Sequence, residues 1–484
     1  MNRRPSSGKP LSDREFHGDL LSVYGREPLL PTEREYKTWS AHGTCFAYAI
    51  ATWCFLTGGI TAQYVGAVHG MVCLIAGNLI GVFLVSVSLS AGCQRYGVEQ
   101  IDFCKPAFGQ NGARVVLIFY LLNMLGWSGL ILVMFGNGIA NIVGALGHEP
   151  EHWQVGAGVA LGIWLTYILT TRGVHLLSLF NSIITVALIF IIVFMFYMLI
   201  SEHGWNEILA AKPLDPLPIP WMNYAVALEL GIASGMSWWG GIGFLARNTK
   251  SRRNAIYPEI LQLGLSFGVV CSIALFSGLV VGSDDPTQWM VPLGGLVMGV
   301  LALVFVALAN ITSTSVSLFA SGLALRHLPG LHKRGWRLII ALTCVPLAFF
   351  VVWPHQLYDL GDAFLAYNGT MHAPVGGILL VDYFFLRKQR LHLRSIFEAA
   401  PSGLYYYSKG FNLLALGCIV LGQVTYFLVY NPFTVTAHPV FHFVPASIAA
   451  FLLPAFVYWT GMKLWLRQGK AEKPEFSRLV APNI

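Results

Sequence analysis

Charged side chains are scarce in this chain. Lys, Arg, Asp and Glu make up 11% of its 484 residues, whereas soluble domains carry roughly 25%. Apolar residues make up 55% of the sequence. This balance excludes an ordinary water-soluble protein, and we expect much of the surface to face lipid.

Cysteine patterns and catalytic motifs are missing as well. The eight cysteines include no CxxC pair and no Cys/His spacing typical of a metal site, so we expect neither a disulfide framework nor a zinc centre. The sequence contains no Walker loop and no paired nucleophile and base, which argues against an enzyme, a cofactor and an ATP-driven pump. The first 38 residues mix acids with bases, so no cleavable signal peptide is expected.

Long apolar stretches fill most of the remaining chain. A helix needs about 20 apolar residues to cross the hydrocarbon core of a membrane. Twelve such stretches predict an all-α integral membrane protein with twelve transmembrane helices. Their expected limits are 40–64, 67–91, 113–139, 154–171, 175–201, 221–246, 256–282, 293–325, 336–353, 359–387, 411–430 and 441–466.

The basic residues fall in every second connector between these stretches. Of the 30 Lys and Arg residues, 29 lie in alternate connectors and the two tails, and Lys212 alone lies on the other side. Connectors rich in Lys and Arg stay in the cytoplasm. We therefore expect both termini in the cytoplasm and the chain in the inner or plasma membrane. The net charge of +7 then faces anionic lipid instead of a nucleic acid.

Glycine distinguishes the first and sixth helices. Helix 1 contains Gly58 and Gly59, and helix 6 contains Gly231, Gly235 and a glycine-rich run at 237–243. The two helices are five positions apart, which is where an inverted five-plus-five repeat places two interrupted helices at a transport site. The alternative is that these glycines allow close packing between helices.

Indole rings accompany these glycines. Helix 3 carries Asn123, Gly126 and Trp127, and a glycine beside a tryptophan leaves room along a flat aromatic face. Ordinary helix packing is the alternative reading of this pattern. Helix 6 adds Ser237, Trp238 and Trp239. A planar heterocycle gripped by two indoles and read by amide and hydroxyl groups fits both patterns.

Helix 8 contains a dense run of hydroxyl side chains. Six hydroxyl or amide side chains occur within 310–317, and oxygen ligands suit a hard cation. Hydrogen bonds from these hydroxyls to their own helix backbone are the alternative. Two acids near membrane depth, Glu229 and Asp362, are further candidates for a protonatable coupling group.

Four segments of the chain resemble the nucleobase:cation symporter-1 family, which includes the purine-cytosine permeases and the allantoin and hydantoin transporters. They are the proline-to-tryptophan lead-in at 31–39, the loop and third helix around 95–97, 108–109 and 126–127, the helix 8 segment 312–319, and the end of helix 10 at 374–384. Together they span about 28–390.

The resemblance implies the fold of the sodium-coupled amino-acid transporters, with two extra C-terminal helices. The expected organisation is a cytoplasmic tail at 1–38, a ten-helix core at 39–390, helices 11 and 12 at 391–467 and a tail at 468–484. Within the core, the inverted repeats are expected at about 39–201 and 221–390.

The resemblance also assigns roles to particular residues. Trp127 is the stacking residue of helix 3, and Trp238 or Trp239 is its counterpart in helix 6. Thr312, followed by Ser313, matches a sodium-ligating hydroxyl. The backbone carbonyls of helix 1 between Ala51 and Phe55, including that of Cys54, are the expected further ligands of the sodium ion. The sequence departs from the family pattern at four places: Ser317 replaces an amide, Ile131 replaces a glutamine, and Ile311 replaces a second hydroxyl. The fourth is the end of helix 6 at 243–247, which lacks the family's acid.

These observations predict a secondary symporter that imports a nucleobase-like heterocycle by alternating access, with Na⁺ or H⁺ as the coupling ion and the monomer as the functional unit. Cytosine, purines, uracil, allantoin and hydantoin are all open as substrates. An amino-acid transporter of the same fold is the nearest alternative. A passive channel would show a continuous polar stripe, and a receptor would carry a larger soluble domain.

Overall fold

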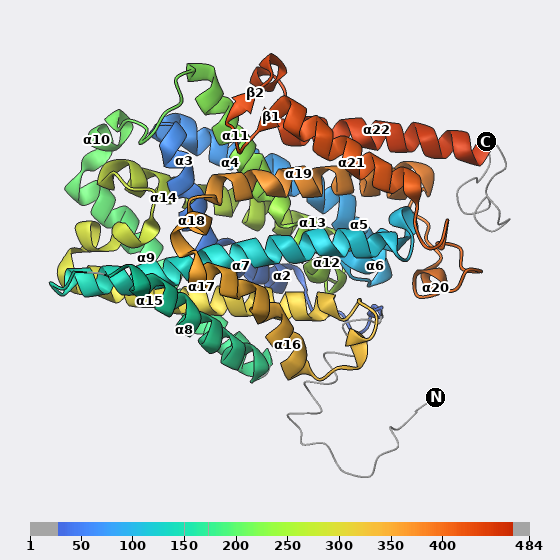
Figure 1. The fold of residues 1–484 in the computed structure, drawn as a ribbon, viewed down its shortest axis with the longest axis horizontal. Coiled ribbons are helices and arrows are strands. Elements are labelled where there is room, and N and C mark those ends of the chain that lie inside the picture. The colour runs from blue at the N-terminus through green and yellow to red at the C-terminus, as the bar shows by residue number, and fades with distance from the viewer. Residues whose placement is uncertain (1–27, 150, 173, 468–484) are drawn as a thin grey trace, which may run out of the picture.

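The computed structural model describes residues 28–149, 151–172 and 174–467. Residues 1–27 of the predicted N-terminal tail and the predicted C-terminal tail at 468–484 lie outside this part of the chain. The described residues form a bundle of long helices (Figure 1). One two-stranded hairpin, β1 (Tyr430–Asn431) paired with β2 (Thr436–Ala437), lies in the connector before the last helix.

The first five predicted spans are all helical. They contain α2 (Thr38–Ala49), α3 (Trp53–Tyr64), α4 (Ala67–Val85), η1 (Ser86–Ser90), α5 (Ala91–Tyr96), α7 (Gly112–Ala145), α8 (His152–Thr171) and α9 (Val174–Glu202), with α6 (Gln100–Phe108) in the connector before α7.

The next five spans follow the short helix α10 (Gly204–Ala210). They contain α11 (Pro220–Ser237), α12 (Trp239–Arg247), α13 (Arg252–Pro258), η2 (Glu259–Ser266), α14 (Phe267–Val281), α15 (Met290–Leu325), α16 (Trp336–Cys344), η5 (Val345–Leu347), α17 (Ala348–Val352), α18 (Pro354–Tyr358), α19 (Gly361–Leu380) and η6 (Val381–Leu386), with η3 (Pro286–Gln288) and η4 (Leu331–Lys333) in connectors.

The C-terminal pair consists of α21 (Leu413–Val429) and α22 (Ala446–Arg467), preceded by α20 (Leu393–Ile396) and η7 (Pro439–His442) respectively. All twelve predicted spans therefore overlap a helix. By length and apolar composition, eight described helices can cross a membrane, or nine when the bent pair α2 and α3 counts as one span. The chain is thus a multi-pass membrane protein, and outward-facing side chains such as Phe190 and Val297 are exposed as lipid contact requires.

Helix 1 is interrupted, but not at its glycines. The axes of α2 and α3 differ by 50° across the break at residues 50–52. Gly59 lies inside α3, where a Cβ would come within 2.1 Å of the Asp284 carbonyl. Gly58 likewise lies against the Cys271 carbonyl of α14. These glycines let backbones approach one another, as the packing alternative proposes.

Helix 6 differs from helix 1, because it is interrupted within the predicted glycine-rich run at 237–243. Its discontinuity falls at Trp238, between α11 and α12. Gly231 and Gly235 instead face α4, where a Cβ would lie 2.6 Å and 2.5 Å from the carbonyls of Cys73 and Asn78. In helix 6 the contacts of Gly231 and Gly235 with α4 are therefore separate from the break, which lies one turn further along the chain.

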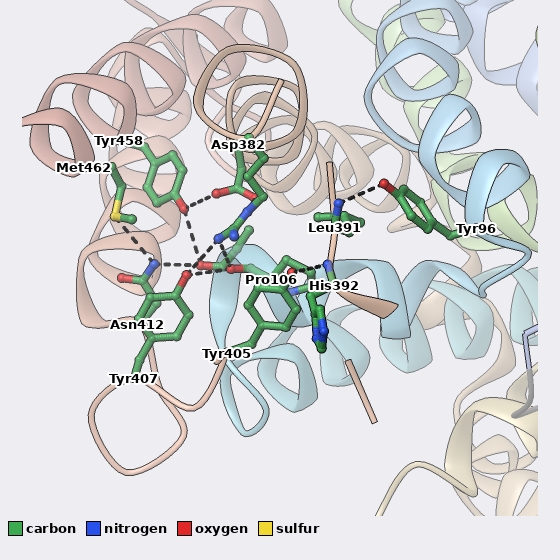
Figure 2. A network of polar contacts seen from close by, with 12 residues as sticks. Tyr96, Pro106, Asp382, Leu391, His392, Tyr405, Tyr407, Asn412, Tyr458 and Met462 are labelled. Atoms are coloured by element: carbon green, nitrogen blue, oxygen red, sulfur yellow. Dashed lines mark hydrogen bonds and ion pairs between the residues drawn. The ribbon is translucent and has the colours of Figure 1, made fainter. Parts of the chain in front are cut away.

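Helices α19, α21 and α22 lie side by side along one edge of the bundle (Figure 1). A polar network fastens this edge to α6. Arg387 donates from Nε to Asp382 Oδ2 at 2.5 Å and from an Nη to the Pro106 carbonyl at 2.6 Å. The hydroxyl of Tyr458 on α22 donates to Asp382 Oδ1 at 2.9 Å. Figure 2 shows these groups with the Tyr407 hydroxyl, which also donates to Pro106.

Candidate substrate-binding cavity

A cavity lies where the interrupted helices meet helices 3 and 8. Its wall is formed by residues of α2, α3, α6, α7, α11, α12, α14 and α15. Most of these side chains are apolar or aromatic, and a small number of polar groups stand among them. This composition is typical of a small-molecule site in a protein.

Four of the seven predicted substrate-binding residues line this cavity. They come from three different helices, and the list is Trp127, Ser237, Trp238 and Ser317. The Ser237 hydroxyl donates to the Ser234 carbonyl at 2.6 Å. The indole N–H of Trp238 is buried without a hydrogen-bond partner among the described residues. A ligand carbonyl or ring nitrogen would satisfy that donor.

The other three predicted residues lie outside the cavity lining. Trp239 is fully buried and stacks on His372, with ring centroids 5.5 Å apart. Asn123 hydrogen-bonds to Asn368 of α19. Gly126 leaves space for the ring of Phe364, whose atoms would come within 2.0 Å of a Cβ there. These residues support the wall from behind, and their part in substrate binding stays a prediction.

Trp53 is a cavity residue that the sequence reasoning did not select. Its ring lies 6.4 Å from that of Trp127 and 5.7 Å from that of Trp238, edge-on to both. Its indole N–H donates to the Tyr48 carbonyl at 2.9 Å, across the break in helix 1. The two predicted stacking indoles therefore share a third indole between them. The sequence carries no clear signal for it, because the break that brings Trp53 to the cavity was expected at Gly58 and Gly59 and lies at residues 50–52.

A cluster of ionisable side chains lies at the end of the cavity nearest the connector 92–112. Glu99 and Gln100 line the cavity, and Gln100 Nε2 donates to the Gly240 carbonyl at 2.6 Å. Glu99 lies 3.3 Å from both Arg247 of α12 and His327 at the end of α15. These pairs join three elements beneath the site, and sequence reasoning did not foresee them because their members are far apart in the chain.

The predicted cation ligands of helix 1 and helix 8 are buried, but among the described residues no hydrogen bond links those of one helix to those of the other. Thr312 Oγ1 donates to the Ala309 carbonyl at 2.9 Å, as the backbone-bonding alternative expects. Cys54 Sγ donates to the Ala51 carbonyl at 2.8 Å. Ser313 is also buried. A cation site between helix 1 and helix 8 therefore stays a prediction.

Polar contacts join the opposite ends of these helices. Gln63 Nε2 donates to Asp284 Oδ2 at 2.6 Å, and the Tyr64 hydroxyl donates to Asp362 Oδ2 at 2.9 Å. Glu229 accepts the backbone N–H of Ser447 at 3.1 Å and so holds the start of α22 against α11. Both acids selected from the sequence are therefore engaged in contacts outside the cavity lining.

A multi-pass bundle with an interrupted first helix and an aromatic cavity beside the break defines a membrane transporter of the broken-helix class. The sequence profile of the permeases for cytosine/purines, uracil, thiamine and allantoin matches residues 30–447. The chain belongs to this permease family.

Named relatives and solved structures agree with this assignment. A purine-uracil permease from Arabidopsis thaliana is 23% identical over 84% of this chain and 71% of its own length. An allantoin permease from Bacillus subtilis is 23% identical over 86% of this chain and 88% of its own length.

The inward-facing structure of Mhp1 superposes with a TM-score of 0.78 at 18% identity, covering 95% of this chain and 98% of that one. A closed Mhp1 structure, described as a nucleobase-cation-symport-1 family transporter with bromovinylhydantoin bound, gives a TM-score of 0.74 at 19% identity, covering 94% and 98%. These superpositions confirm the predicted fold class.

Proposed function

We propose that the chain imports a small planar nitrogen heterocycle of the nucleobase, allantoin or hydantoin class, together with a cation. The cavity of three indoles beside the helix 1 break carries this proposal. Aromatic faces bind planar rings of any nitrogen pattern. Unpartnered polar atoms such as the Trp238 N–H then select among them. The names of the relatives point to the same substrate class.

The route of transport follows from the two ends of the cavity. Asp284 and Asp362 join the ends of helices on the side that the distribution of basic residues assigns to the outside. The cavity instead reaches Glu99, in a connector assigned to the cytoplasm. We therefore place this conformation at the inward stage of an alternating-access cycle, with both termini cytoplasmic and the monomer as the transport unit. A coupling cation drives import only if it binds the two stages with different affinity.

Trp127 provides the test of this function. Loss of its ring removes one stacking face, and stacking on an aromatic side chain contributes about 1–3 kcal/mol per base. We expect Trp127→Ala to weaken heterocycle binding about tenfold or more, and Trp127→Phe to weaken it less. The measurement is uptake of labelled cytosine, uracil, adenine, allantoin and hydantoin into vesicles, with ligand-dependent thermal stabilisation alongside.

Leu428→Ala is the matched control, because this side chain is exposed on α21 at the lipid-facing surface. Free amino acids added in excess should leave uptake unchanged. Competition by amino acids, or full uptake in Trp127→Ala, would contradict the proposed site.

A further inference from the structure

Two helices at equivalent places in the predicted repeats contain π-helical segments. Spans 2 and 7 are five positions apart, and they contain η1 (Ser86–Ser90) and η2 (Glu259–Ser266). A π turn displaces backbone groups from their usual partners and often marks a functional site. Here Asn78 Nδ2 donates to the carbonyls of Leu263 and Gly264 at 2.6 Å and 2.7 Å. Hydrogen bonds from span 2 therefore satisfy carbonyl groups in the π segment of span 7.

The first residues of the two π segments meet. Ser86 Oγ donates to Glu259 Oε2 at 2.5 Å, and Ser90 lies beside the same carboxyl group. Glu259 is only 1% exposed. Its other oxygen, Oε1, has no hydrogen-bond partner among the described residues, and neither has Ser90 Oγ. Burying a carboxyl group within a membrane span with one oxygen lacking a hydrogen bond costs free energy, and such groups usually serve a function.

Few ionisable groups surround this carboxyl group. Cys45 of α2 and Cys93 of α5 interact with it electrostatically, and Cys93 also interacts with Arg247 of α12. His42 of α2 contacts Gln262 of η2 instead, whose Nε2 lies 3.1 Å from His42 Nδ1.

The other neighbouring elements supply no counter-ion. In α14 the ionisable residue is Cys271, and in α4 they are His69 and Cys73, both more than three helical turns from Ser86. Those of α13 are exposed: Arg252, Arg253 and Tyr257.

The ion pairs of the described chain do not include Glu259. An ionised carboxylate buried without a cation costs several kcal/mol. In this conformation the carboxyl group therefore holds a proton, and Ser86 donates its hydrogen bond to Oε2 of the neutral acid. A change of surroundings that brings water to the carboxyl group would release that proton.

The element that controls access to this group is part of the transport machinery. Helix α2 is the half of interrupted helix 1 that packs on η2, and Cys45 on its buried face lies beside the carboxyl group. Because α2 is separated from α3 by the 50° break, it can tilt without its other half. Such a tilt would open Glu259 to water on the same side as the cavity.

We propose, on the basis of the heterocycle transport proposed above, that Glu259 is the binding site of the coupling proton. One carboxyl oxygen takes up one proton when the site faces outward, and the neutral acid crosses the cycle with the bound heterocycle. Movement of α2 then exposes the acid, and the proton leaves to cytoplasmic water. The carboxyl group alternates between neutral and one negative charge, so each uncharged heterocycle enters with one positive charge.

Reconstituted full-length protein in vesicles that contain a pH-sensitive dye tests this site. In the wild type, adding heterocycle outside should acidify the lumen, and an inward proton gradient should raise accumulation. We expect Glu259→Gln to retain heterocycle-dependent thermal stabilisation. It should no longer acidify the lumen, and its gradient-driven accumulation should be at least tenfold lower than that of the wild type. Glu259→Asp should retain acidification, since it still titrates. Glu35→Gln, at an exposed position, is the matched control and should behave as the wild type.

Infrared spectroscopy provides a readout that does not depend on the substrate. The wild type should show a carboxylic-acid carbonyl band that disappears when the group is deprotonated and is missing in Glu259→Gln. Ser86→Ala should shift this band, because the acid loses its hydrogen bond. If Glu259→Gln does not fold, this shift alone assigns the band.

The outcomes separate the two proposals. Heterocycle binding combined with unaltered acidification in Glu259→Gln, or with uptake driven by Na⁺ alone, overturns the proton site and leaves the transport function standing. Absence of any heterocycle binding overturns the transport function, and the titrating band then decides whether Glu259 binds a proton. A band that is unaffected by both Glu259→Gln and Ser86→Ala also overturns the site.

Discussion

At the scale of single residues, Trp53 decides how much room the site offers. It stands edge-on to Trp127 and Trp238, so a ligand has to share the space with its ring. We expect Trp53→Ala to enlarge the site and to favour bicyclic purines over single-ring pyrimidines about tenfold, since small changes in pocket volume alter selectivity by that order. The measurement is the ratio of the inhibition constants of adenine and cytosine.

Trp53→Phe is the graded control for this prediction. It keeps an aromatic ring but loses the N–H that donates to the Tyr48 carbonyl, so the selectivity should change by an intermediate amount. Equal ratios in the wild type and both variants would show that Trp53 does not limit ligand size.

The residue scale also shows where sequence reasoning reaches its limit. The indoles of helices 3 and 6 were predicted from their glycine neighbours, and Trp127 and Trp238 do line the cavity. Sequence alone left Trp238 and Trp239 equivalent, because a one-residue step turns a helical side chain by about 100° and the backbone at the break sets which one faces inward. Glu99 was missed since its partners, Arg247 and His327, come from distant segments.

At the scale of elements, glycines set the distance between α4 and α11. A Cβ at Gly81 would lie 2.2 Å from the Ile232 carbonyl, and one at Gly235 would lie 2.5 Å from that of Asn78. We expect Gly81→Ala to force the two helices apart and to cost about 1–3 kcal/mol of stability. Thermal unfolding in detergent should show a lower Tm.

Gly417 offers a matched control within α21. A Cβ there has no neighbouring atom within 4 Å, so Gly417→Ala should leave the Tm unchanged or raise it through better helix propensity. Equal Tm values for Gly81→Ala and Gly417→Ala would contradict the close-packing role of Gly81.

The same elements explain a partial success of the sequence prediction. Each of the twelve spans predicted from apolar length overlaps a helix, and eight or nine of the described helices are long and apolar enough to cross a membrane, because the membrane imposes such length on the sequence. The interruption of helix 1 was expected at Gly58 and Gly59, yet it lies at residues 50–52. Glycine permits both unwinding and close contact, and the choice between them depends on a partner helix that local sequence does not specify.

At the scale of the whole molecule, the C-terminal helix pair is fastened to the floor of the cavity through α6. Asp382 and Arg387 are buried together and hold α22 through Tyr458 and α6 through Pro106 (Figure 2). The same short helix begins at Gln100, which lines the cavity. A disturbance at this edge should therefore reach the transport site.

Removal of one charge tests this connection. Arg387→Ala would leave Asp382 buried without its cation, which costs about 3–5 kcal/mol, so we expect a lower Tm and reduced uptake. Adding Asp382→Asn to Arg387→Ala removes the stranded charge and should restore much of the Tm, because a neutral amide tolerates burial better than a carboxylate. If uptake recovers together with the Tm, the pair acts through stability alone. Recovery of the Tm without recovery of uptake would show that the C-terminal pair positions α6 at the cavity, since the contacts of Arg387 with Pro106 and Tyr407 are then still absent.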